Sequence, residues 1–93
     1  MTDLLSFNFK HDDESKNRTY QFKKDKKIKE ILLFYLSNTN SIMTLDVDKI
    51  MFLNKSKILN SPNYLDKTIA ETFKYNKQNA QIQIKDPGNV VGG

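Results

Sequence analysis

The chain has 93 residues, with 15 Lys and Arg against 11 Asp and Glu, and a net charge of +4. This length predicts one small domain, whose core would draw on six Phe and four Tyr. The absence of cysteine excludes a disulfide framework, a thiolate nucleophile and a cysteine metal site, and no apolar run predicts a signal peptide or a membrane span.

The first segment has the pattern of a β-hairpin. Apolar and polar residues alternate over 5–10 and again over 20–23, which predicts two strands with one buried face each. The residues between them, 11–18, are polar and predict a longish loop. This loop contains His11, Asp12, Asp13 and Glu14. Adjacent loop residues lack the fixed spacing of metal ligands, so we favour a polar turn and predict no metal site.

The next segment predicts the main helix. Apolar residues recur at helical spacing and form one stripe, namely Ile28, Ile31, Leu32, Tyr35 and Leu36. We expect Asp25 to cap its N-terminus and residues 37–40 to end it. Leu33 and Phe34 lie off the stripe. They either widen the buried face, which we favour, or form a second contact patch.

The lysine-rich stretch 23–29 precedes and enters this helix. It could bind nucleic acid by neutralising phosphates. A solvated helix face is the favoured interpretation, because no exposed aromatic residue is interleaved for base stacking. We therefore expect no nucleic-acid partner.

The second half of the chain predicts shorter elements. Residues 42–48 receive no assignment. Residues 49–53 predict a strand with Ile50 and Phe52 on one face, followed by a turn at 54–56, a short paired segment at 58–59 and a loop at 60–63. Thr68 and Glu71 have the spacing of a capping box, which predicts a brief helical turn that buries Ile69 and Phe73.

The chain closes with a strand and a tail. Strict alternation over 80–85 predicts a strand with one buried face. Pro87 and Gly88 predict that pairing stops near Asp86. We therefore expect a body over residues 1–86 and a flexible extended tail over 87–93, which ends in Gly92-Gly93. Two residues without side chains leave a slim carboxyl end.

This order of elements resembles the β-grasp fold of ubiquitin and its relatives. The resemblance is carried by residues 49–55, by residues 68–71 followed by Ile82-Gln83-Ile84, and by the terminal Gly92-Gly93. It implies an α+β fold in which a mixed sheet of four to five strands packs on one main helix, with a short helical turn before the last strand.

The same resemblance implies a protein modifier. The Gly93 carboxylate would be activated by partner enzymes and joined to target lysines, and the chain could be released from a longer precursor. The implied partners are activating, conjugating and processing enzymes and the target proteins. The chain itself would be no enzyme and would hold no cofactor. We expect a monomer in the cytoplasm or nucleus of a eukaryotic cell, away from membranes.

The resemblance also places a partner-docking surface on the outer face of the sheet, at Met51, Leu53, Gln83 and Lys85. The equivalent surface of ubiquitin is apolar. Because Gln83 and Lys85 would be desolvated without partners, receptors of ubiquitin's apolar patch should bind this chain poorly. Asn89-Val90-Val91 stand where ubiquitin is rich in arginine.

Two other functions fit the same pattern. One is a β-grasp interaction domain of a larger protein that binds partners without being conjugated. The other is a sulfur carrier, a small β-grasp protein whose terminal glycine carries a thiocarboxylate. We rank the sulfur carrier third, because the pronounced helix and the second helical turn are closer to the modifiers.

Overall fold

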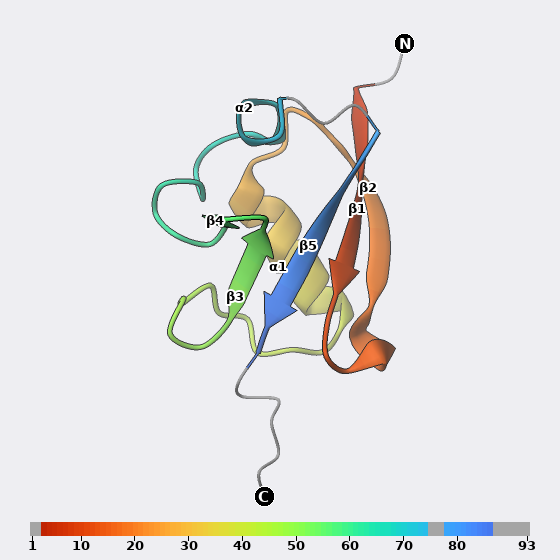
Figure 1. Ribbon diagram of the computed structural model, residues 1–93, viewed down its shortest axis with the longest axis vertical. Helices are drawn as coiled ribbons and strands as arrows, with labels where there is room; N and C mark the ends of the chain where they lie inside the picture. The colour runs from red at the N-terminus through yellow and green to blue at the C-terminus, as the bar shows by residue number, and fades with distance from the viewer. Residues whose placement is uncertain (1–2, 75–77, 87–93) are drawn as a thin grey trace, which may run out of the picture.

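The computed structural model describes residues 3–74 and 78–86, which form a mixed five-stranded sheet and one main helix (Figure 1). An α+β fold of this composition was predicted from the sequence. Its elements, in chain order, are β1 (Leu4–Lys10), the 3₁₀ turn η1 (Glu14–Lys16), β2 (Arg18–Lys23), α1 (Ile28–Asn38), β3 (Met51–Asn54), β4 (Lys57–Ile58), α2 (Ile69–Thr72) and β5 (Asn79–Lys85).

The sheet has the strand order β2-β1-β5-β3-β4. The first and last strands pair in parallel at its centre, with Phe7 beside Ala80 and Phe9 beside Ile82. The other three pairings, β1 with β2, β3 with β5 and β3 with β4, are antiparallel. The strand that precedes the tail is therefore held on both sides.

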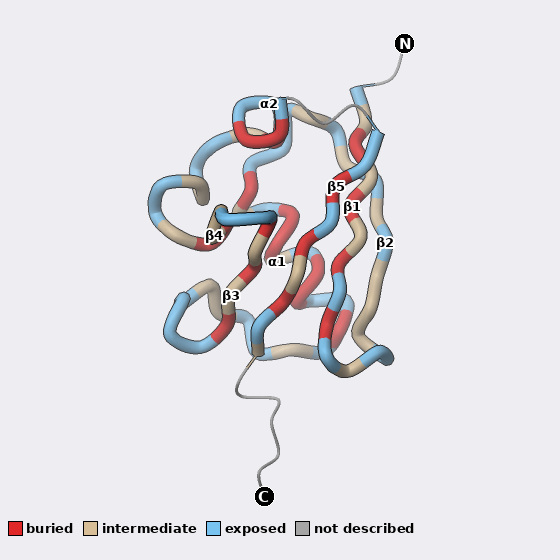
Figure 2. The backbone as a smooth tube through the Cα atoms, in the orientation of Figure 1, coloured by how far each residue is buried: buried red, intermediate tan, exposed pale blue. Residues whose placement is uncertain are grey.

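The main helix α1 lies against one face of the sheet and leaves the other face open (Figure 1). The alternation predicted from the sequence is confirmed, because every second residue of β1 and β5 is buried toward the helix side (Figure 2). Phe7, Phe9, Phe52, Ile82 and Ile84 are at most 1% exposed and join the buried stripe of α1 in one core cluster. Among residues 3–74 and 78–86, neither α1 nor α2 has the length and apolar character of a membrane-spanning helix.

The two residues off the helical stripe have different roles. Leu33 packs partly buried against the core and widens the buried face. Phe34 is 44% exposed, and its ring meets Tyr20 and Phe22 edge-on at centroid distances of 4.9 and 5.5 Å. Leu33 therefore realises the first alternative, and Phe34 lies at the exposed edge of the aromatic residues of β2.

The predicted cap of α1 was wrong. The N-cap is Lys27 and not Asp25, and Glu30 accepts a hydrogen bond from the Lys27 amide at 2.8 Å. The reason lies in the backbone partners of the preceding residues. The carbonyl groups of Lys24 and Lys26 accept hydrogen bonds from the amides of Ala70 and Ile69, and the Lys26 amide donates to Lys23, so residues 24–26 form a turn and the helix begins only after Lys27. The predicted capping box at Thr68 and Glu71 is confirmed.

The stretch that received no assignment has no helix or strand in the structure. It is attached to the body by Asn60, which is 2% exposed. The Asn60 side-chain amide donates to the carbonyl oxygens of Leu45 and Ile50 at 3.0 and 2.7 Å and accepts from the Phe52 amide at 3.1 Å. These three bonds fix the approach of the chain to β3.

Tyr35 connects the helix to both the sheet and the hairpin loop. Its fully buried ring stacks on Phe9 at 4.7 Å and meets Phe52 edge-on at 6.0 Å. Its hydroxyl donates to the carbonyl oxygen of Lys16 at 2.7 Å. The ring therefore contributes packing energy, and the hydroxyl fastens the loop that follows β1.

We predict that Tyr35→Phe lowers the free energy of unfolding by about 1 kcal/mol at neutral pH, because the ring contacts remain and one hydrogen bond is lost. Urea unfolding measures this difference. Tyr64→Phe, which removes a hydroxyl outside the core cluster, is the matched control and should leave stability nearly unchanged. Equal effects of the two substitutions would contradict the assigned role of the Tyr35 hydroxyl.

Burial raises the pKa of Tyr35 from 10.0 to about 12. The folded chain thus keeps this proton over a pH range in which the unfolded chain has lost it. The contribution of the Tyr35 hydroxyl to the free energy of unfolding is fully present below pH 10 and is lost as the pH rises toward about 12. Since the Tyr35→Phe variant lacks the group, we expect the stability of the native sequence to fall relative to that variant between these two values. If the difference in free energy of unfolding between the two proteins stayed constant over this pH range, the prediction would be wrong.

Candidate docking surface and the root of the C-terminal segment

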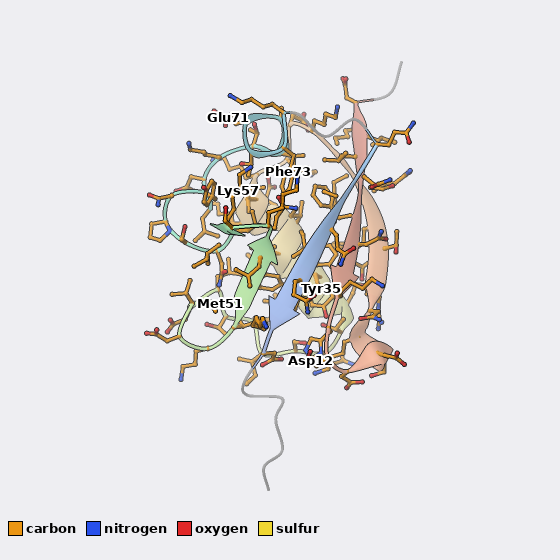
Figure 3. The ribbon with its side chains drawn as sticks, in the orientation of Figure 1. Asp12, Tyr35, Met51, Lys57, Glu71 and Phe73 are labelled. Carbon is orange, nitrogen blue, oxygen red and sulfur yellow. The ribbon has the colours of Figure 1, made fainter. Side chains whose placement is uncertain are left out.

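The structure brings the four predicted docking residues together on the open face of the sheet. Met51 on β3 lies opposite Lys85 on β5, and Leu53 lies opposite Gln83. Each alternates with a residue that is buried toward α1, so all four point away from the helix. Figure 3 shows Met51 on β3 at this face. Met51, Leu53 and Gln83 are half-buried, and Lys85 is exposed.

Two further residues extend this surface across the sheet. Gln83 also lies beside Lys10 of β1, and Leu53 also lies opposite Ile58 of β4. One row therefore crosses four strands in the order Lys10, Gln83, Leu53, Ile58. We call these four residues, with Met51 and Lys85, the open-face surface. The alternation over residues 5–10 assigns Lys10 to the outer face, but its place beside Gln83 depends on a register that the sequence does not show.

The open-face surface changes in chemistry from one side to the other. Its β3 and β4 side carries the half-buried apolar residues Met51, Leu53 and Ile58. The amide side chain of Gln83 occupies the middle, between Leu53 and Lys10. Such a surface can accept apolar contact at one side and hydrogen bonds in the middle.

A buried histidine, His11, holds Asp86, the residue that follows β5. The His11 side chain is 2% exposed, and its Nδ1 accepts a hydrogen bond from the Asp13 amide at 2.9 Å. The proton of the neutral ring is therefore on Nε2, which donates to Asp86 Oδ2 at 3.2 Å. Because β1 and β5 are parallel, His11 and Asp86 each follow the carboxyl end of a central strand. Their hydrogen bond closes this end of the sheet.

The acidic residues next to His11 make local hydrogen bonds. Within residues 3–74 and 78–86, no group of three or more His, Asp or Glu side chains could hold a metal ion. Asp13 instead caps η1, and hydrogen bonds from the hydroxyl and amide of Ser15 lower the pKa of its carboxyl group. Hydrogen bonds from Thr68 likewise lower the pKa of Glu71 in the capping box. These shifts have structural causes and assign no acid or base role.

The predicted conjugation terminus, Gly92 and Gly93, lies outside the described residues, as does the rest of the predicted tail over 87–93. What the structure describes is the strand that leads to it. Pairing of β5 ends at Lys85, where the sequence predicted it to stop. Asp86 is the last described residue and is held by His11.

No protein-family model matches this chain, and the search of curated proteins gave no match. The function of the chain must therefore be inferred from its own residues.

We predict that Asp86→Ala lowers the free energy of unfolding by about 1–3 kcal/mol, because the buried His11 Nε2 proton loses its acceptor. Asp12→Ala is the matched control, since it removes a carboxylate from an exposed position next to His11 in the sequence. Urea unfolding of both variants at neutral pH measures the difference. If Asp86→Ala were no more destabilising than Asp12→Ala, the His11 hydrogen bond would not hold this end of the sheet.

Proposed function

We propose that this chain is a ubiquitin-like protein modifier with a β-grasp body. The observation that carries the proposal is the strand order, with the first and last strands parallel at the centre, the other pairs antiparallel and one helix across a single face. This arrangement agrees with the β-grasp topology implied by the sequence. It supports a body whose last strand leads directly to the segment that ends in Gly92-Gly93.

The geometry at the end of β5 also supports a presented C-terminus. The two neighbouring strands and the bond between His11 and Asp86 fix the chain up to residue 86. Seven residues remain after this point, and they include Pro87 and the three glycines of the chain. A start that is fixed at residue 86 gives an enzyme a defined position from which to reach the carboxyl end.

In the proposed reaction, an activating enzyme joins the Gly93 carboxylate to AMP from ATP and releases pyrophosphate. A cysteine thiolate of that enzyme displaces AMP to form a thioester. A target lysine amine then displaces the thiolate, which gives an isopeptide bond. Partner enzymes supply every acid, base and nucleophile. The chain supplies the acyl group and the open-face surface through which partners dock.

We expect the full chain with an N-terminal affinity tag to form covalent adducts of higher mass in an ATP-supplied extract of its own cells. The Gly93 deletion should form none, because its terminal carboxylate is displaced by one residue. Denaturing gels with mass spectrometry measure the adducts. Deletion of the N-terminal Met1 is the matched control and should conjugate normally. Adducts that persist after Gly93 deletion, or that never form, would contradict a modifier.

The open-face surface also suits a second candidate function, a β-grasp interaction domain that is never conjugated. Its half-buried apolar residues and the amide of Gln83 can bind a partner without covalent chemistry. The same assay separates the two, because such a domain would retain noncovalent partners after Gly93 deletion and would show no isopeptide bond. A sulfur carrier would instead show one oxygen of Gly93 replaced by sulfur in the native protein.

A further inference from the structure

The strands of this sheet carry no acidic residue. The chain has 11 Asp and Glu, yet none of them falls within the strand ranges of β1, β2, β3, β4 or β5 that the structure describes. The charged side chains on the open face are lysines. Lys10 and Lys85 lie at the end where β5 finishes, and Lys23 lies across from Leu4 at the opposite end. All three are exposed.

Lys85 borders the apolar residues of the open-face surface, and Lys10 lies in the same surface on the other side of Gln83. Lys85 lies directly opposite Met51, and Lys10 is in one row with Gln83, Leu53 and Ile58. An ammonium group on a long flexible stem can thus reach a partner whose apolar side chains rest on β3 and β4. The partner that matches both features carries aliphatic side chains next to carboxylates.

Two other kinds of partner fit the open-face surface less well. A second copy placed open face to open face would bring lysines against lysines with no carboxylate on either side, which is unfavourable. Single-stranded nucleic acid would need aromatic side chains on which bases stack. The aromatic residues of the described strands point to the helix side, where Phe7, Phe9, Tyr20, Phe22 and Phe52 belong to the core or pack against it.

We propose that the open-face surface binds an acidic amphipathic segment of a partner protein. Its aliphatic residues contact Met51, Leu53 and Ile58, and its Asp or Glu side chains pair with Lys10 and Lys85. The inference deepens the proposed function, on which it rests for the role of this surface, by naming the chemistry of the docking partner.

Binding can be tested with a synthetic amphipathic helical peptide that has Leu on one face and Glu on the other. The control peptide has each Glu replaced by Gln. NMR titration of the isotopically labelled full chain should show binding of the Glu peptide, with shift changes at β1, β3, β4 and β5 and weakening at higher salt. The Gln peptide should bind at least severalfold more weakly. Equal binding of both peptides, or shift changes elsewhere, would overturn the proposal.

The lysine contribution is tested by the double variant Lys10→Gln/Lys85→Gln. We expect it to bind the Glu peptide about tenfold more weakly, roughly threefold for each exposed pair. The matched control Lys26→Gln/Lys67→Gln removes the same charge from two exposed positions off the sheet and should bind within about twofold of the native chain. Equal weakening in both double variants would show a nonspecific charge effect and overturn the proposal.

Two further measurements complete the test. A thymidine oligonucleotide that bound more tightly than the Glu peptide would assign the lysines to nucleic acid and overturn the proposal. The peptide titration repeated on the Gly93 deletion separates docking from conjugation, because docking needs no terminal carboxylate. Binding without conjugation would reject the modifier alone, and conjugation without binding would reject the acidic partner alone.

Discussion

The parallel pairing of β1 with β5 is the interaction on which the rest of this structure depends. It joins the first and last strands at the centre of the sheet, so the chain between them must supply both flanks and the helix that covers one face. Parallel neighbours also end at the same edge. For this reason His11 and Asp86, which are 75 residues apart in the sequence, meet at that edge and fix the point from which the final segment leaves.

The same pairing decides which side chains partners can reach. Because α1 covers one face only, alternate residues of β1, β3 and β5 are buried and the residues between them lie on the open face (Figure 2). The buried half is aromatic and aliphatic, with Tyr35 stacked on Phe9 at its centre. The presented half combines lysines and amides with a few apolar residues. A surface of this kind is suited to recognition through charge complementarity, which contributes to the rate and specificity of association.

The sequence predicted the parts of this fold that depend on local patterns. Alternation of apolar and polar residues predicted the strands of the hairpin and β5. Helical spacing of apolar residues predicted α1, and the spacing of Thr68 and Glu71 predicted α2. The cap at Lys27 was missed because hydrogen bonds to Ile69 and Ala70, more than 40 residues away, set the start of the helix. The half-buried surface was predicted only in part, since placing Lys10 beside Gln83 and Ile58 beside Leu53 requires strand registers. The hydrogen bond between His11 and Asp86 also depends on the register of β1 with β5, so no local sequence pattern predicts it.

We propose above that partner enzymes join the Gly93 carboxylate of this body to lysines of other proteins. Trypsin cleaves after Lys85, so a target lysine that had received the chain would carry residues 86–93 as a branched remnant. A proteomic search of the native cells for this remnant is the most direct measurement. We expect branched peptides with Asp86 to Gly93 attached through Gly93 to lysines of other proteins. The proposal would be contradicted if the mature protein gave this peptide only in linear form, either free or continued beyond Gly93.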